Sequence, residues 1–239
     1  MSYSNPNKAY LLLEDGTYLE GEACGVKGTT GGEICFNTGM TGYQEIYTDP
    51  SYYGQVIINT VSHIGNYGVE KAEQESSAPK FAGLICKDFA EVFSRKIADG
   101  SLQEYFEKYN VVGIHGVDTR MLVRHVRNHG AQNCVISTES GDLDFLRKKL
   151  SEVPPMGGLE LSSVVSTKEA YYVGDPEAKH KVAVLDLGVK TSILNNIVER
   201  GAYLKVFPAK TTFAEMEAWG AEGYFISNGP GDPATMPYA

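Results

Sequence analysis

The last quarter of the chain alternates apolar runs with helical segments, and this alternation restricts the fold more than any other feature. The run Val182–Leu187 is apolar apart from Asp186, as expected of a strand buried on both faces of a parallel sheet. The alternating segments are Val182–Leu187, Lys190–Arg200, Tyr203–Phe207, Thr211–Trp219 and Gly223–Ser227. The order strand, helix, strand, helix, strand predicts the first half of a doubly wound α/β sheet.

The third apolar run ends in the turn Asn228–Pro233, which is rich in glycine and proline. Glycine lets another molecule approach the main chain closely, and proline removes its own N–H donor. Parallel sheets bind their ligands at the carboxyl ends of strands. The amides of Gly229 and Gly231 are therefore candidates for binding an anion or a developing oxyanion. The alternative is a turn that only leads to the next helix.

The first 150 residues predict a β-rich α/β domain. Apolar or alternating runs predict strands at Tyr10–Leu13, Tyr18–Glu22, Glu33–Thr38, Gln55–Val61 and Phe81–Cys86. Helical spacing predicts helices at Ser101–Tyr109, Asp118–Asn128 and Asp142–Leu150. Proline and glycine pairs then predict a linker, with one ordered piece near Leu159–Val165. We therefore expect domains at residues 1–150 and 181–239, joined by a linker at 151–180.

Composition excludes several classes of function. The net charge is −9 and the pI is about 5.1, which disfavours binding to nucleic acid or to an anionic membrane surface. Met1–Lys8 lacks the apolar core of a signal peptide, and no apolar run has the length of a membrane span. Cys24, Cys35, Cys86 and Cys134 are irregularly spaced and form no Cys-x-x-Cys pair. We therefore expect a cytoplasmic protein without disulfides or a zinc knuckle.

Two further motifs have spacings typical of binding sites, but the neighbouring residues disfavour that interpretation. Gly25–Gly32 matches no phosphate-loop fingerprint and leads into a strand, so a flexible connection is the favoured interpretation. His125 and His129 have a spacing that suits zinc, but Arg124 and Arg127 flank them and no third ligand is indicated. A basic helix face that pairs with an acidic partner is favoured over a metal site.

No residue is predicted to be a nucleophile. None of the four cysteines sits in the strand-to-helix motif Gly-x-Cys-x-Gly, which exposes and activates a thiolate. Cys134 begins an apolar run and is predicted to belong to the core. Asp118 is predicted to cap its helix rather than to act as an acid, and His63 and His115 to be structural histidines.

Seven longer motifs follow one another over essentially the whole chain: Phe36–Glu45, Thr48–Tyr52, His63–Asn66, Val117–Arg120, Gly130–Asn133, Val184–Lys190 and Ser227–Pro233. In this order they resemble the small subunit of glutamine-dependent carbamoyl-phosphate synthase. The last motif also resembles other class I glutamine amidotransferases. An amidotransferase of anthranilate synthesis fits less well, because such proteins lack an N-terminal domain containing Thr41–Glu45.

The resemblance implies a glutaminase subunit that hydrolyses glutamine through a cysteine thioester. It supplies ammonia through a tunnel to a large synthetase subunit, for carbamoyl phosphate formation in arginine and pyrimidine biosynthesis. ATP and its divalent metal are expected on the large subunit, and no cofactor or metal in this chain. The implied glutamine-binding positions are Ser51, which reaches across the domain interface, Gly229 and Gly231. The Gly229 amide is the implied oxyanion donor.

The resemblance also implies a departure from the family. Its nucleophilic cysteine, histidine and glutamate match positions beyond Ala239. We therefore expect a fragment, with three strands and two helices of the amidotransferase domain, that hydrolyses no glutamine alone. The alternative is a non-catalytic docking module for the large subunit. On either interpretation, Arg120, Arg124 and Arg127 are candidates for contacting an acidic patch of that subunit.

Overall fold

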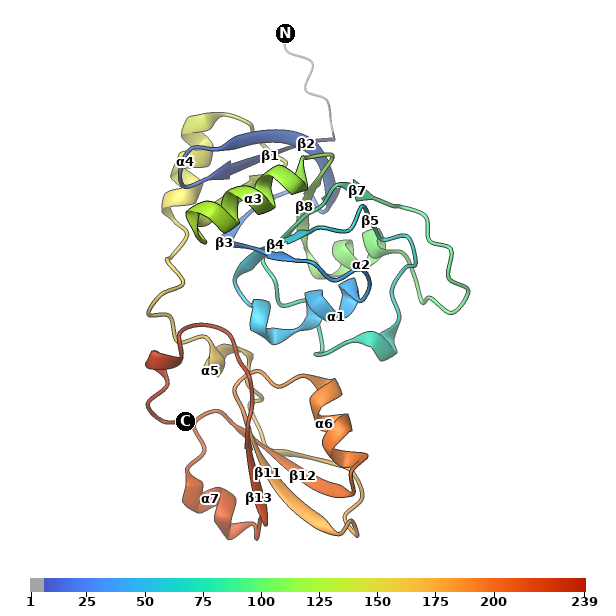
Figure 1. The fold of residues 1–239 in the computed structure, drawn as a ribbon, viewed down its shortest axis with the longest axis vertical. Coiled ribbons are helices and arrows are strands. Elements are labelled where there is room, and N and C mark those ends of the chain that lie inside the picture. The colour runs from blue at the N-terminus through green and yellow to red at the C-terminus, as the bar shows by residue number, and fades with distance from the viewer. Residues whose placement is uncertain (1–6) are drawn as a thin grey trace. The chain divides into compact units, whose positions relative to one another are not determined.

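The computed structural model describes residues 7–239 and divides into two compact units (Figure 1). Unit 1 comprises the chain up to Thr48, Gly54–Gln74 and Ala78–Pro155. Unit 2 comprises Asp49–Tyr53, Glu75–Ser77 and Met156–Ala239. Two short segments from the first half of the sequence therefore belong to unit 2. The domain boundaries expected at residues 150 and 181 stay a prediction.

Unit 1 is a closed β-barrel of mixed direction. In barrel order its strands are β1 (Lys8–Leu13), β2 (Tyr18–Gly25), β8 (Val112–His115), β6 (Gly83–Ile85), β4 (Gln55–Asn59), β3 (Thr29–Asn37) and β9 (Asn133–Ser137). Neighbours from β8 through β6 and β4 to β3 are parallel, and the other pairs are antiparallel. Alternate side chains such as Leu11, Ile34 and Ile58 point inward and are fully buried in the core.

Among the described residues, unit 1 has four helices: α1 (Tyr43–Thr48), α2 (Leu102–Tyr109), α3 (Thr119–His129) and α4 (Leu143–Ser151). A short helical turn η2 (Lys71–Glu73) and a two-stranded ribbon, β5 (His63–Ile64) with β7 (Asp88–Phe89), complete it. Ser101 and Glu104 form the expected capping box of α2, and Asp118 caps α3 by accepting from the amide of Met121. The helices predicted here are confirmed to within one or two residues.

The glycine-rich stretch 25–32 is more ordered than its composition suggests. Gly31 and Gly32 lie inside β3 and pair with β9. A Cβ atom on Gly31 would overlap the side chain of Val153, and one on Gly32 would overlap the carbonyl oxygen of Gly54. The interpretation as a flexible connection is therefore wrong for these two positions. They are glycine because the barrel packs closely against them.

Unit 2 contains a four-stranded sheet in the order β10 (Tyr171–Val173), β12 (Ala202–Pro208), β11 (His180–Asp186), β13 (Gly223–Ile226). Strands β12, β11 and β13 are parallel, as the sequence predicts, whereas β10 is antiparallel to β12. The helical segments of unit 2 are η1 (Pro50–Tyr52), α5 (Ser162–Val165), α6 (Thr191–Val198), α7 (Phe213–Ala218) and η3 (Pro233–Thr235). The three strands expected in the last segment are confirmed as β11, β12 and β13, and the expected linker adds a fourth strand, β10, to their sheet.

Helices α6 and α7 lie on opposite sides of this sheet (Figure 1). Val184 and Val206 pack in one apolar cluster with Leu194 of α6. Leu185 packs in the other cluster with Met216 of α7. This alternation explains why β11 is apolar on both faces, and the fold is mixed α/β as expected. No helix in residues 7–239 is long and apolar enough to cross a membrane.

Candidate functional site

The loop after β11 is closed by the carboxylate of Asp186, which is only 5% exposed. One of its oxygens accepts hydrogen bonds from the amides of Gly188, at 2.9 Å, and Val189, at 2.8 Å. The other accepts from the amide of Thr167 at 2.7 Å. A buried carboxylate requires such donors because its desolvation is costly. Asp186 therefore fixes the backbone at the carboxyl end of the central strand.

The loop after β13 packs directly against the loop after β11. The amide of Leu187 donates to the hydroxyl of Ser227 at 2.9 Å, and the side-chain amide of Asn228 donates to the carbonyl of Gly188 at 3.2 Å. A Cβ atom on Gly229 would overlap the carbonyl oxygen of Leu187. Only glycine fits at position 229 without moving one of the two loops.

Gly231 is constrained in a different way. Its φ is +86°, in the left-handed region, and it forms an isolated antiparallel bridge with Glu160. A Cβ atom there would lie 2.7 Å from the carbonyl oxygen of Leu159. Within residues 7–239, neither the Gly229 amide nor the Gly231 amide donates a hydrogen bond. The turn therefore holds two fixed main-chain donors whose hydrogens have no acceptor in the described chain.

Ser51 lies on η1, in the first segment that unit 2 takes from the early sequence. Asp49 caps this turn by accepting from the Ser51 amide at 2.9 Å, and its other oxygen lies 3.5 Å from the ammonium of Lys190. The hydroxyl of Ser51 accepts a hydrogen bond from the side-chain amide of Asn228 at 2.9 Å. The structure thus brings Ser51 to the loop that contains Gly229 and Gly231, the other two sequence-predicted site residues.

Glu75, in the second such segment, was not anticipated from the sequence. It is 8% exposed, and its side chain accepts from the amide of Ser192 at 2.9 Å. Its backbone carbonyl accepts from the amide and the hydroxyl of Thr191, at 3.0 and 3.1 Å. These are N–H groups of the first turn of α6, which Lys190 does not cap with its own side chain. Lysine at the N-cap position 190 cannot accept hydrogen bonds from the first amides of the helix. This was the only sequence signal that another segment accepts them.

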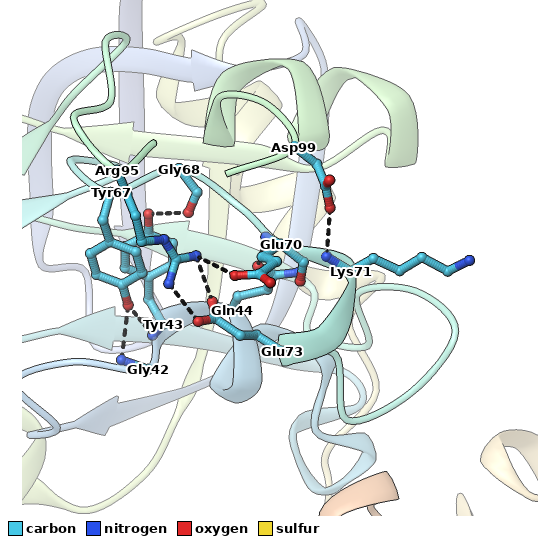
Figure 2. Close-up of polar contacts among 10 residues, drawn as sticks. All are labelled: Gly42, Tyr43, Gln44, Tyr67, Gly68, Glu70, Lys71, Glu73, Arg95 and Asp99. Atoms are coloured by element: carbon cyan, nitrogen blue, oxygen red, sulfur yellow. Dashed lines mark hydrogen bonds and ion pairs between the residues drawn. The ribbon is translucent and has the colours of Figure 1, made fainter. Parts of the chain in front are cut away.

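Both segments follow directly from parts of unit 1 that are bound to each other, which Figure 2 shows. The side chain of Gln44 donates to the carbonyl of Glu70 at 2.8 Å and accepts from its amide at 2.7 Å. The hydroxyl of Tyr67 accepts from the amides of Gly42 and Tyr43, at 2.8 and 3.0 Å. Residues 42–45 are thereby fixed to the loop 67–73, so part of the longest motif has a structural role.

Arg95 adds charge to this network (Figure 2). It forms a two-point ion pair with Glu73, at 2.5 and 2.9 Å, and its guanidinium also lies 3.6 Å from Glu70. The same guanidinium stacks over the ring of Tyr67 at 5.2 Å. The hydrogen bonds to Glu73 raise the pKa of Arg95 above its ordinary value. The ion pairs of Arg95 with Glu70 and Glu73 therefore stabilise the loop that leads to Glu75.

The four cysteines all belong to unit 1 and lie outside this loop cluster. Cys24, Cys86 and Cys134 are buried, and burial raises the pKa of Cys134. Burial, together with the charge of Glu33, raises the pKa of the partly buried Cys35 to about 12. The raised pKa values of Cys35 and Cys134 and the burial of Cys24 and Cys86 suit none of these thiols to act as a nucleophile.

The paired histidines of α3 are engaged in local contacts. The ring of His125 pairs with the carboxylate of Asp15, and the ring of His129 bonds the carbonyl of His125 at 2.9 Å. Over residues 7–239 there is no group of three or more His, Cys, Asp or Glu side chains placed to hold a metal ion.

Comparison with known proteins assigns the chain to a family. Residues 11–136 match the model of the carbamoyl-phosphate synthase small chain, CPSase domain, and residues 183–239 match that of class I glutamine amidotransferase. The chain belongs to the carbamoyl-phosphate synthase small chain family. Ser51 lies within the first match and Asn228 within the second, so their hydrogen bond links a residue of each matched region.

Carbamoyl phosphate synthase small chains of several bacteria are similar to it. That of Synechococcus sp. is 41% identical, with 99% of this chain and 63% of the relative aligned. That of Vibrio cholerae is 42% identical, over 97% of this chain and 65% of the relative. That of Thermotoga maritima is 44% identical, over 96% of this chain and 58% of the relative. The chain thus spans less than two thirds of the length of these small chains.

Proposed function

We propose that this member of the carbamoyl-phosphate synthase small chain family serves as the glutaminase subunit, which supplies ammonia to a large synthetase subunit. Glutamine would bind at the loop Asn228–Gly231, with Ser51 beside it. The observation that carries the proposal is the hydrogen bond between Ser51 and Asn228, next to two main-chain amides without acceptors among the described residues.

The chemistry that this loop suits is acyl transfer from a carboxamide. Attack on the amide carbon of glutamine moves negative charge onto its carbonyl oxygen, and fixed N–H donors stabilise that charge. The amide of Gly229 is the proposed donor, because glycine lets this position lie close to the β11 loop. A Cβ there would overlap the carbonyl oxygen of Leu187. Gly231 and the hydroxyl of Ser51 would hold the rest of the substrate. This preorganisation lowers the cost of forming the tetrahedral intermediate.

The nucleophile is proposed to come from outside these 239 residues, because all four cysteines are in unit 1 and three of them are buried. We therefore propose that the 239-residue chain hydrolyses no glutamine alone. In the complete system the large subunit would bind ATP with a divalent metal, in the cytoplasm, for arginine and pyrimidine biosynthesis. A non-catalytic docking module is the second candidate, and the position of all four cysteines in unit 1 is the observation that favours it.

Glutamine turnover by the complete protein with its large chain separates these two functions. We expect the assembly to release glutamate from glutamine, and the 239-residue chain alone to release none. Ser51→Ala should raise the KM for glutamine, whereas Ser51→Thr, which keeps the hydroxyl, should restore much of the affinity. An assembly that makes carbamoyl phosphate only from added ammonia would reject the glutaminase function and support the docking module.

A further inference from the structure

The orientation of the Asn228 side-chain amide is set by two acceptors. Its Nδ2 atom lies 3.2 Å from the carbonyl oxygen of Gly188 and 2.9 Å from the hydroxyl oxygen of Ser51. A carbonyl oxygen only accepts hydrogen bonds, so the amide must present its nitrogen, not its oxygen, to Gly188. The Oδ1 atom is buried and has no partner within residues 7–239, so no contact of the oxygen favours the opposite orientation. Asn228 is therefore a donor to both groups.

Both residues of the Asn228–Ser51 contact are fixed by further hydrogen bonds. The hydroxyl of Ser227, which is 8% exposed, donates to the main-chain carbonyl of Asn228 at 2.7 Å. On η1, Asp49 accepts from the amide of Ser51, and the amide of Tyr52 donates to the carbonyl of Asp49 at 3.2 Å. Groups that are already held in place lose little conformational entropy when they bond. The donor and the acceptor are therefore preorganised.

The contact with Asn228 decides how the Ser51 hydroxyl can act on a bound molecule. A serine hydroxyl has one hydrogen to donate and two lone pairs that accept. Nδ2 of Asn228 occupies one lone pair, and within the described residues the hydroxyl hydrogen has no acceptor. Ser51 is also only partly buried, so a ligand can reach it. The hydroxyl is therefore available as a donor.

We propose that Asn228 is a positioning residue of the glutamine site. By donating to Ser51, its side chain directs the hydroxyl hydrogen of Ser51 toward an oxygen of bound glutamine. A donated hydrogen bond favours an oxygen of the substrate over its ammonium group, which has no lone pair to accept it. Because the hydroxyl is oriented before glutamine binds, less entropy is lost on binding. The inference rests on the proposed function, since glutamine is the proposed ligand of this loop.

The kinetics of glutamine hydrolysis by the full-length protein with its large chain test this role. In Asn228→Asp the carboxylate has nearly the size of the amide, but it accepts from the Ser51 hydroxyl and so withdraws the hydrogen from the substrate. Asn228→Ala removes the donor without adding an acceptor. Each substitution is made alone and together with Ser51→Ala. The matched control is Asn195→Asp, the same change at an exposed residue of α6. Thermal unfolding verifies that each variant is folded.

We expect Asn228→Asp to raise the KM for glutamine by about tenfold with little change in kcat. Asn228→Ala should raise it by about threefold, because the Ser51 hydroxyl can still rotate and donate. Added to Ser51→Ala, Asn228→Asp should change the KM by less than about twofold, because no hydroxyl remains to be misdirected. The control should also stay within about twofold of the unmodified protein.

A purely structural role of Asn228 predicts a different result. Displacement of the turn would move Gly229, the proposed oxyanion donor, so kcat would fall whether or not the Ser51 hydroxyl is present. Equal effects of Asn228→Asp with and without Ser51→Ala would therefore overturn this inference alone, since the unmodified protein still hydrolyses glutamine. An unmodified assembly that releases no glutamate would instead overturn the proposed function, and this inference with it.

Discussion

Asn228 donates a hydrogen bond to Ser51 at 2.9 Å, although 177 positions of sequence separate the two residues. Asn228 follows the edge strand β13, and Ser51 lies on a turn just before the barrel strand β4. The contact places a hydroxyl beside the turn that holds Gly229. A residue from the first quarter of the chain therefore takes part in the structure of that turn.

Replacing Ser51 with alanine leaves the Nδ2 atom of Asn228 with only the carbonyl of Gly188, at 3.2 Å. We expect unfolding to become easier by about 0.5–1.5 kcal/mol, the usual net value of one hydrogen bond. Urea denaturation measures this change. Ser51→Thr keeps the acceptor oxygen and should recover most of the loss. Equal stability of the alanine variant and the unmodified protein would show that the contact contributes nothing.

Gly229→Ala tests the close approach of the two loops. The added methyl group overlaps the carbonyl oxygen of Leu187, so the turn must shift, and we expect a loss of roughly 1–3 kcal/mol in unfolding free energy. Glutamine turnover in the complete assembly should fall with it, because the amide donor moves. Gly157→Ala is the matched control, since nothing lies within 4 Å of a Cβ there. Similar effects of both substitutions would argue against a steric requirement at position 229.

The pH dependence of stability should contain a contribution from Asp15. Burial raises its pKa, but hydrogen bonds from Thr17, His125 and Gln132 outweigh this and hold the pKa well below the ordinary 3.8. The contribution is therefore present above about pH 4 and is lost as the pH falls toward the folded pKa. Urea unfolding across this range should show a shallower acid loss for Asp15→Asn. Asp144→Asn, at a side chain 92% exposed, should keep the slope of the unmodified protein.

The thiols of the folded chain should react slowly with a disulfide reagent. A pKa of about 12 for Cys35, against an ordinary 9.0, reduces its thiolate fraction near pH 8 by about a thousandfold. Absorbance of the released thiol, with and without urea, measures the difference. All four cysteines should become reactive only on unfolding. A thiol that reacts at the rate of a free one in the folded chain would reopen the search for a nucleophile among these residues.

Local signals predicted the helices and the parallel strands well. Glu104 follows Ser101 by three positions, and Val182–Leu185 of β11 is an unbroken apolar run, so both features can be recognised without tertiary structure. The three-residue strand β10 was missed because it is short and is defined only by pairing with β12. Barrel closure was missed for the same reason, since it depends on pairs such as β1 with β9.

The candidate site shows the same division. Gly229 and Gly231 stood out from their own turn, and the resemblance to a family supplied Ser51. The contact of Glu75 with Ser192 spans 117 positions, and the sequence around each residue gives no sign that it contacts the other residue. Arg95 likewise lies in a stretch without regular structure, and only the fold reveals its pairing with Glu73. Long-range polar contacts of this kind produce no periodic pattern in the sequence, so they cannot be predicted from it.

The two early segments that belong to unit 2 also limit how this protein can be divided. A fusion protein that contained only residues 156–239 would lack Asp49, Ser51 and Glu75. Helix α6 would then begin with uncapped amides, and Lys190 and Asn228 would lose their partners. Residues 156–239 are therefore expected to fold less stably when they are expressed without residues 49–53 and 75–77.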